Sequence, residues 1–349
     1  MQKSRYWLWR VLRVVLPLLI SALAIWWVVR KLDFAELWAT LRNMHLAGLL
    51  LNLLVYMAGL VFRALSFSTI LGAKFSHMES FHGMNAGYFL NNILPFRLGE
   101  FGRAALMVAH SKKKASFMEV FAGIVTERTL DVVIGLVLFI GGLILIKSTL
   151  VPVWTLVLAL VLILGMVVLP ALGAKYKEKV MTFLWTRYQD RKIVREKLLP
   201  WLGNFLKGFE VFLQPKRITL AIVVLFISWL FAILQVYLLQ KQLMTGAVWW
   251  WPFVVVPTST FIMALPSMPG GIGVYEVGFE RAYAMLGAPM SAAVAIALVM
   301  HVFQLIVPSI LGVIGVYALG ENIGSLVNKA QFAKTEAVKQ AEAESADIE

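Results

Sequence analysis

Six long apolar runs constrain this chain more than any other feature of its sequence. A helix needs about 20 apolar residues to cross the hydrocarbon core of a bilayer. The chain is 60% apolar and 15% charged, whereas soluble domains are about 45–50% apolar and about 25% charged. A soluble or disordered chain is therefore excluded, and we expect an all-α, polytopic membrane bundle. The predicted spans cover residues 12–29, 46–71, 117–146, 153–170, 218–240 and 290–319.

The first run raises the question of a cleaved signal peptide. Lys3, Arg5, Arg10 and Arg13 precede it, as they would precede a signal sequence. The run is long, however, and lacks the small-residue cleavage pattern of signal peptides. We expect a retained span, followed by a short interfacial helix that begins at a capping box of Asp33 and Glu36.

Two further stretches are too polar in the middle to cross lipid as plain helices. The stretch 81–109 carries Pro95, several glycines and charged residues between two short apolar runs. The stretch 247–287 contains the turn LPSMPGGIGVYE at residues 265–276. Broken backbone at membrane depth is tolerated only inside protein or beside a wet cavity. Each stretch therefore predicts a re-entrant helical hairpin.

The charge distribution predicts an orientation. The net charge is +13, and the strongly basic segments 3–13, 112–114 and 171–217 fall on one side of the predicted bundle. Basic loops mark the cytoplasmic side, so we expect a multi-pass plasma membrane protein with both termini in the cytoplasm. The two hairpins then enter from opposite faces. Because the basic residues flank apolar runs, they indicate membrane orientation and anionic lipid, and no nucleic-acid partner is expected.

The order of elements predicts an inverted repeat. Residues 1–147 and 148–320 each contain a span, an amphipathic helix, a second span, a hairpin and a third span. Paired broken helices in inverted halves are typical of transporters, with the site at the midplane between the halves. Residues 321–349 form an acidic tail without an apolar stripe, for which we expect a loose helix or disorder in the cytoplasm.

The first hairpin supplies one group of candidate site residues. Glu100 and Arg103 are three residues apart, so they share a helix face and can pair. Guanidinium groups can hold phosphate through two hydrogen bonds, so this group predicts a phosphate site. The alternative is an internal ion pair that only ties down the hairpin. The group consists of Asn91, Asn92, Arg97, Glu100 and Arg103.

A second group lies on the spans themselves. Glu127 and Asp131 are four residues apart on one helix face, where they could neutralise Arg63, Arg97 or Arg103. Ionisable residues inside membrane segments are expensive and usually functional. Arg128 could instead extend its charge to the cytoplasmic surface, and that alternative stays open, as it does for Arg63.

The second hairpin supplies the third group. Gly270, Gly271 and Gly273 precede a helix that contains Glu276. Glycine-rich backbone at a helix start offers N–H groups to an anion, while the plainer alternative is a tight turn between packed helices. Glu276 could bind a cationic headgroup, carry a proton or pair with an arginine.

Other chemistry is poorly supported by the sequence. The chain contains no cysteine, and its five histidines show no metal-ligand spacing. We expect no metal or other cofactor, no catalytic residue and hence no enzyme. His301 and Gln304 on the last span are expected to form a packed polar pair, and the alternative is that they line the cavity.

Three motifs resemble the signatures of one family. They are LPFRLGEFGR at 94–103, ERTLD at 127–131 and PGGIGVYE at 269–276. In this order they resemble the lysylphosphatidylglycerol synthase transmembrane-region family, also called flippase-like domain proteins. Members with a soluble aminoacyl-transferase domain also synthesise the lipid, but nothing folded is expected here after Gly320. The resemblance therefore implies the membrane domain and not the synthase activity.

We expect a lipid flippase or transporter that moves a phosphate-bearing polar lipid between leaflets. The lipid would be a phospholipid or a lipid-linked precursor, and a separate enzyme could supply it. The alternatives are a membrane-embedded lipid or glycolipid transferase and a non-transporting scaffold subunit.

Overall fold

The computed structural model describes residues 2–94, 98–111, 115–145, 153–188, 191, 194–265 and 267–324. This part of the chain is helical and contains no strand. Its α-helices are α1 (Gln2–Val29), α2 (Phe34–Arg42), α3 (Leu46–Leu71), α4 (His77–Ile93), α5 (Gly99–His110), α6 (Phe117–Leu145), α7 (Val153–Lys175), α8 (Lys177–Tyr188), α9 (Leu199–Gly208), α10 (Pro215–Leu243), α11 (Pro252–Ile262), α12 (Val274–Met285) and α13 (Met290–Ala318). Short helical turns join some of them: η1 (Gly72–Lys74), η3 (Val194–Leu198), η4 (Phe209–Leu213) and η5 (Pro269–Gly271).

The predicted all-α membrane bundle is confirmed. Five described helices, α3, α6, α7, α10 and α13, are long and apolar enough to cross a membrane, and α1 with α2 makes a sixth if that bent pair is one span. The two helices meet at 84°. The bend comes at the predicted cap, where Asp33 accepts hydrogen bonds from the N–H groups of Ala35 (2.8 Å) and Glu36 (3.1 Å).

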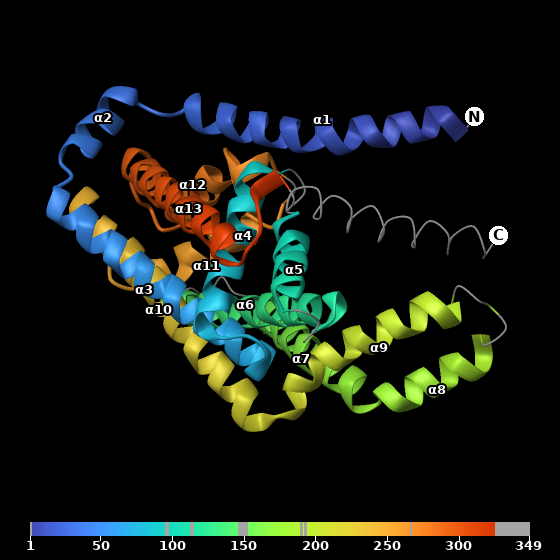
Figure 1. Cartoon of the computed structure of the whole chain (residues 1–349). Coiled ribbons are helices and arrows are strands. Elements are labelled where there is room, and N and C mark those ends of the chain that lie inside the picture. Colours follow the sequence, from blue (N-terminus) through green and yellow to red (C-terminus); the bar gives the residue numbers. More distant parts are fainter. Residues whose placement is uncertain are drawn as a thin grey trace.

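Helices α3 and α10 lie side by side and antiparallel, along the left flank of the molecule in Figure 1. Three hydrogen bonds of 2.8–2.9 Å from side chains to carbonyl groups join them: Asn52 to Gln235, Ser66 to Ala221 and Ser228 to Gly59. Interhelical hydrogen bonds of this kind help to hold membrane helices together. Because the pair is antiparallel, the hairpins that follow α3 and α10 start at opposite ends of it.

The hairpins are built as the sequence predicts. Helices α4 and α5 pack together as the first hairpin, and α11 and α12 form the second. Each hairpin crosses to the other half of the chain, since α4 packs on α13 and α11 packs on α6. The amphipathic helices cross in the same way, with α2 on α13 and α9 on α6. This matched exchange of contacts is the packing expected of an inverted repeat.

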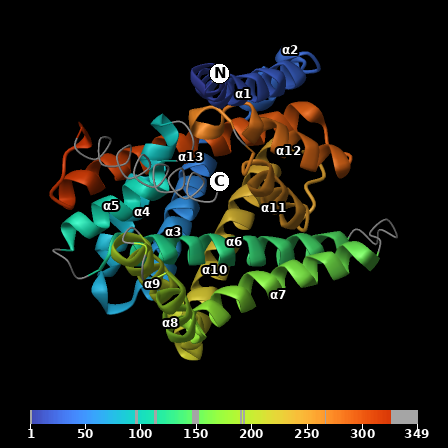
Figure 2. The ribbon, with the colours of Figure 1, turned by 90° about the vertical axis from the view of Figure 1, so that its right-hand side faces the viewer.

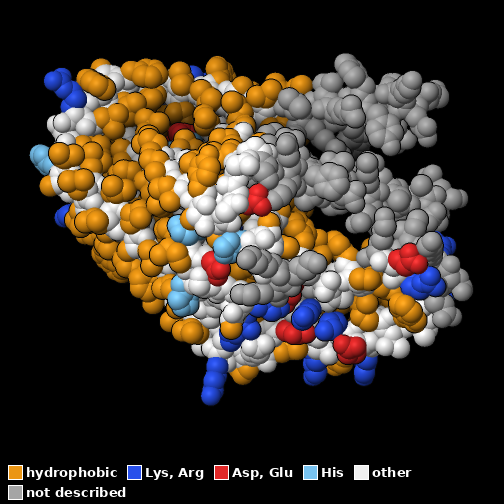
Figure 3. Space-filling model, in the orientation of Figure 1, with side chains coloured by type: hydrophobic (Ala, Val, Ile, Leu, Met, Phe, Trp, Pro, Cys, Tyr) orange, Lys and Arg blue, Asp and Glu red, His pale blue; other side chains and the backbone are white. Residues whose placement is uncertain are grey.

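The halves differ in how their first helices pack. Helix α1 lies across α12, whereas α7 lies beside α6 and α9 (Figure 2). Hydrophobic side chains cover most of the visible body in Figure 3, while charged side chains gather toward α8 and α9. That concentration fits the predicted basic segment at 171–217. The predicted basic segment at 112–114 and the tail beyond residue 324 lie outside the described residues.

Substitutions at two adjacent glycines of α6 can test whether α6 packs closely on α11. A Cβ atom on Gly142 would lie 2.7 Å from Val254 Cγ2 and 3.1 Å from the carbonyl carbon of Phe253, whereas a Cβ on Gly141 meets no atom within 4 Å. We expect Gly142→Leu to lower the free energy of unfolding by about 1–3 kcal/mol, the usual cost of overpacking. Gly141→Leu is the control, since both changes raise helix propensity equally. Unfolding in mixed micelles would measure both, and equal stabilities would contradict this packing.

Candidate functional site

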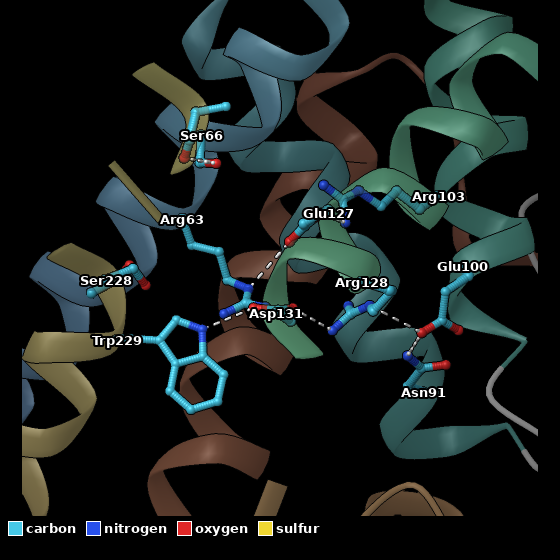
Figure 4. Close-up of polar contacts among 12 residues, drawn as sticks. Arg63, Ser66, Asn91, Glu100, Arg103, Glu127, Arg128, Asp131, Ser228 and Trp229 are labelled. Carbon is cyan, nitrogen blue, oxygen red and sulfur yellow. Dashed lines mark hydrogen bonds and ion pairs between the residues drawn. The ribbon is translucent and has the colours of Figure 1, made fainter. Parts of the chain in front are cut away.

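Six charged side chains meet at the centre of the first half (Figure 4). Arg63 of α3 donates to Glu127 at 3.2 Å and also pairs with Asp131. Arg103 of α5 donates to the other oxygen of Glu127 at 2.8 Å. The predicted neutralisation of Arg63 and Arg103 by Glu127 and Asp131 is confirmed.

Burial separates two parts of this network. Arg103 and Glu127 have side-chain exposures of 2% and 0%, and the Arg103 guanidinium lies 3.4 Å from the ring centroid of Phe67. Buried charges cost several kcal/mol unless they are paired. Arg103 and Glu127 therefore hold α5 against α6. Their depth does not fit the substrate contact that the sequence predicts.

Arg128 is the accessible part of the network. Its side chain is 40% exposed. It makes two loose pairs, with Asp131 at 3.4 Å and with Glu100 at 4.0 Å. Its Nε atom is buried and makes no hydrogen bond within the described structure, and its Nη1 donates only to Asp131. Arg128 therefore has donor capacity left for a ligand.

The charges of the described network balance. Arg63, Arg103 and Arg128 face Glu100, Glu127 and Asp131. Attraction for a phosphate must therefore come from the free donors of Arg128 and not from excess charge among these six. Arg97, predicted as a phosphate ligand, lies outside the described residues.

Two asparagines hold the end of the first hairpin. Asn91 accepts a hydrogen bond from the Gly99 N–H at 2.8 Å, so it caps the start of α5. It also donates to Glu100 at 3.3 Å and so orients the Glu100 carboxylate. Asn92 donates to Leu305 O at 3.2 Å and to Ser309 Oγ at 3.0 Å on α13. These bonds tie the hairpin end to the other half of the chain.

The second hairpin is closed by its own hydrogen bonds. Gly270, Gly271 and Gly273 have φ angles of 73°, 77° and 86°, which only glycine adopts readily. The Gly273 N–H donates to Glu276 at 2.8 Å, and the Gly271 N–H donates to Met268 O at 2.9 Å. These two groups are not available to an anion, so the tight-turn alternative describes them better.

His301 is the partner of Glu276. Its Nδ1 lies 2.5 Å from Glu276 Oε1, its Nε2 lies 2.8 Å from Gly270 O, and its ring stacks on Tyr275 at 4.5 Å. Gln304, three residues further along α13, was the companion expected from the sequence. Trp229 was also missed, although it donates to Asp131 at 3.1 Å from α10.

Both hairpins line one cavity of about 560 Å³. It lies between the halves, where the sequence places the site. The predicted site residues in its wall are Arg63, Asn91, Asn92, Glu100, Arg128, Asp131, Gly270 and Gly271. Four others lie behind the described wall: Arg103, Glu127, Gly273 and Glu276. Apolar side chains such as Val55, Phe231 and Met300 complete it.

No group of three histidine, aspartate or glutamate side chains suitable for a metal ion occurs in the part of the chain that the structure describes. The polar part of the cavity instead presents two guanidinium groups, Arg63 and Arg128, together with two carboxylates and neutral amides. This set can bind a phosphate and the polar groups attached to it.

Comparison with known proteins gives a consistent result. Residues 14–312 match the family described as the lysylphosphatidylglycerol synthase TM region. A UPF0104 membrane protein of Pyrococcus horikoshii is 24% identical over 87% of this chain and 95% of its own length. Another, from Methanothermobacter thermautotrophicus, is 25% identical over 85% of this chain and 89% of its own. No solved structure matches.

Proposed function

We propose, on the premise that this chain belongs to the lysylphosphatidylglycerol synthase TM-region family, that it moves phosphate-bearing polar lipids between the leaflets of the membrane. It is a multi-span membrane protein, and its family relates it to membrane lipids. The observation that carries the proposal is Arg128, which is 40% exposed and loosely paired at a cavity between the two halves.

The cavity suits a headgroup. Small-molecule sites measure about 300–1,000 Å³, and the volume of about 560 Å³ falls in that range. In this proposal the phosphate accepts hydrogen bonds from the free N–H groups of Arg128, and Glu100 binds other polar groups of the ligand. The acyl chains remain in the bilayer, so only the polar part enters the protein.

The inverted packing supports alternating access. Each hairpin lies on the last span of the other half, so rocking of the halves moves both hairpins relative to the cavity. Transporters with inverted repeats expose a midplane site to each side in this way. The proposal assigns no covalent step to the protein, and a separate enzyme would supply any modified lipid. The basic segments would face the cytoplasm.

Lipid movement in vesicles tests the proposal. The purified full chain would be reconstituted into phosphatidylglycerol-containing liposomes with tail-labelled NBD-phosphatidylglycerol, and dithionite would report the fraction of label in the outer leaflet. We expect Arg128→Gln to slow lipid movement about 10- to 100-fold, because a hydrogen bond to a charged group contributes about 1.5–3 kcal/mol. Asp131 keeps Arg63 and Trp229 as partners, so the variant should fold.

Lys216→Gln is the matched control, since Lys216 is exposed at the start of α10. It should leave the rate unchanged. Equal rates in wild type and Arg128→Gln would remove Arg128 from the site. No movement above protein-free liposomes for any labelled phospholipid would contradict transport itself.

A further inference from the structure

His301 is surrounded by acceptors. The residue is 4% exposed, and both ring nitrogens face oxygen atoms, Glu276 Oε1 at 2.5 Å and Gly270 O at 2.8 Å. A backbone carbonyl can only accept, and an ionised carboxylate can only accept. A neutral imidazole has one N–H group. It can therefore satisfy one of the two contacts and not both.

The two contacts together require one bound proton. Either His301 carries a proton on each nitrogen, or Glu276 is protonated and donates to Nδ1 while Nε2–H donates to Gly270. Both arrangements contain the same number of protons. If that proton leaves, two lone pairs face each other in a buried position, which costs free energy.

The first half contains a counterpart that cannot release a proton. There, Glu100 near the start of α5 faces Arg128 on α6. In the second half, Glu276 near the start of α12 faces His301 on α13. Arginine stays protonated in proteins, whereas histidine titrates near neutral pH. The two pairs occupy matching places, and only the second one contains a histidine, the side chain that titrates near neutral pH.

We propose that the Glu276–His301 pair binds a proton that couples lipid transport to pH. With the proton bound, His301 holds both the carboxylate of α12 and the Gly270 carbonyl of the turn. Gly270 and Gly271 line the cavity. Release of the proton frees the turn 267–273 to move relative to α13, which changes the cavity wall. The inference rests on the proposed transport function.

Among the groups around His301, Glu276 is the charged side chain that contacts the ring. Tyr275 on α12 stacks on the ring, and Tyr56 on α3 stacks on Phe303 of α13. The other titratable side chains of helices α12 and α4, which pack on α13, are Glu280, Arg281 and Tyr283 of α12 and His77, Glu79, His82 and Tyr88 of α4. Helices α4 and α10 contribute neutral Asn92 and Gln235 to the cavity wall. The charged residues of α2, Glu36 and Arg42, are exposed. The charged side chains in the described cavity wall are Arg63, Glu100, Arg128 and Asp131.

Hydrogen exchange tests the proton site without relying on transport. The full chain in lipid nanodiscs would be labelled across a pH series, and exchange would be expressed as protection factors that remove the intrinsic pH dependence. In wild type, protection of the turn 267–273 should fall about tenfold as pH rises, as expected for one lost hydrogen bond to a charged group. His301→Gln should show low protection at every pH.

Two variants should keep protection at every pH. In His301→Arg the guanidinium donates to both acceptors and does not titrate. In Glu276→Gln the side-chain amide can donate to Nδ1 of neutral His301, so no extra proton is needed. If one variant fails to fold, as judged by loss of protection in α3, the other still decides. Protection in wild type that is independent of pH would overturn the proposal.

His110→Gln is the matched control. His110 also lies between two acceptors, Glu79 Oε1 at 2.9 Å and Leu319 O at 3.1 Å, but at the base of the first hairpin. Partial burial opposes ionisation of Glu79, yet its hydrogen bonds with Ser76 and His110 lower its pKa. The control should leave the turn 267–273 unchanged. If His110→Gln lowered the protection of the turn 267–273 as much as His301→Gln does, the pH response could not be assigned to the Glu276–His301 pair.

The transport assay separates the two proposals. If NBD-phosphatidylglycerol moves in wild type but neither its rate nor turn protection depends on pH, the proton site is wrong and transport stands. If the turn responds to pH as expected but no labelled phospholipid moves, the transport proposal is wrong and the proton site stands, while its coupling to transport does not.

Discussion

Replacing Glu127 with glutamine is expected to lower the free energy of unfolding by about 3–5 kcal/mol. Glu127 is fully buried and pairs with both Arg63 and Arg103. Removing one partner from a buried ion pair is costly because the remaining charge is left without compensation. Here the loss leaves Arg103 with no carboxylate partner in the described structure, while Arg63 keeps Asp131.

Unfolding in mixed micelles would measure this loss, with Glu210→Gln as the control. Glu210 pairs with Lys177 at 3.1 Å but is 42% exposed, and surface pairs contribute about 0–1 kcal/mol. The double variant Glu127→Gln/Arg103→Met should recover about half the loss, since it removes the unpaired charge. A Glu127→Gln protein as stable as Glu210→Gln would contradict the buried pairing.

The second large effect is expected at Gly99, where α5 begins. A Cβ atom there would lie 2.0 Å from the carbonyl oxygen of Gly87 and 2.6 Å from Asn91 Oδ1. The first atom is backbone, so the two helices of the hairpin must separate to admit even a methyl group. We expect Gly99→Ala to cost about 3 kcal/mol, the upper end of the usual range for overpacking.

The same unfolding measurement, with Gly203→Ala as control, tests this expectation. The nearest atom to a Cβ on Gly203 is Met181 Cε at 3.5 Å, an ordinary contact. Hydrogen exchange of α4 and α5 would show where the variant opens. A Gly99→Ala protein with wild-type protection in both helices would mean that they lie farther apart than described.

Much of the architecture was predictable because the membrane restricts the choices. Five of the six predicted spans, the two broken stretches and the cap at Asp33 all follow from local composition, and the structure confirms them. The pairing of Arg63 with Asp131 was anticipated for the same reason, since a charge inside the bundle must find an opposite charge.

The partners between distant helices were harder to predict. Helical spacing relates residues within one helix, so it indicated Gln304 for His301 and not Glu276, which belongs to another helix. Trp229 gave no signal because an indole on an apolar span looks like core or interface. The burial of Arg103 depends on Phe67 and Glu127 from two other helices, and no local pattern contains that information.

The exchange of contacts between the halves has a consequence for synthesis. Helix α4 lies on α13, so the first hairpin has no complete partner until the last span has been made. At about 5–20 residues per second, that wait is roughly 10–45 s. The six charges of the central network, in contrast, all lie within the first 131 residues. The nascent first half can therefore neutralise its own charges early, while the face of α4 that packs on α13 stays open to lipid until α13 has been made.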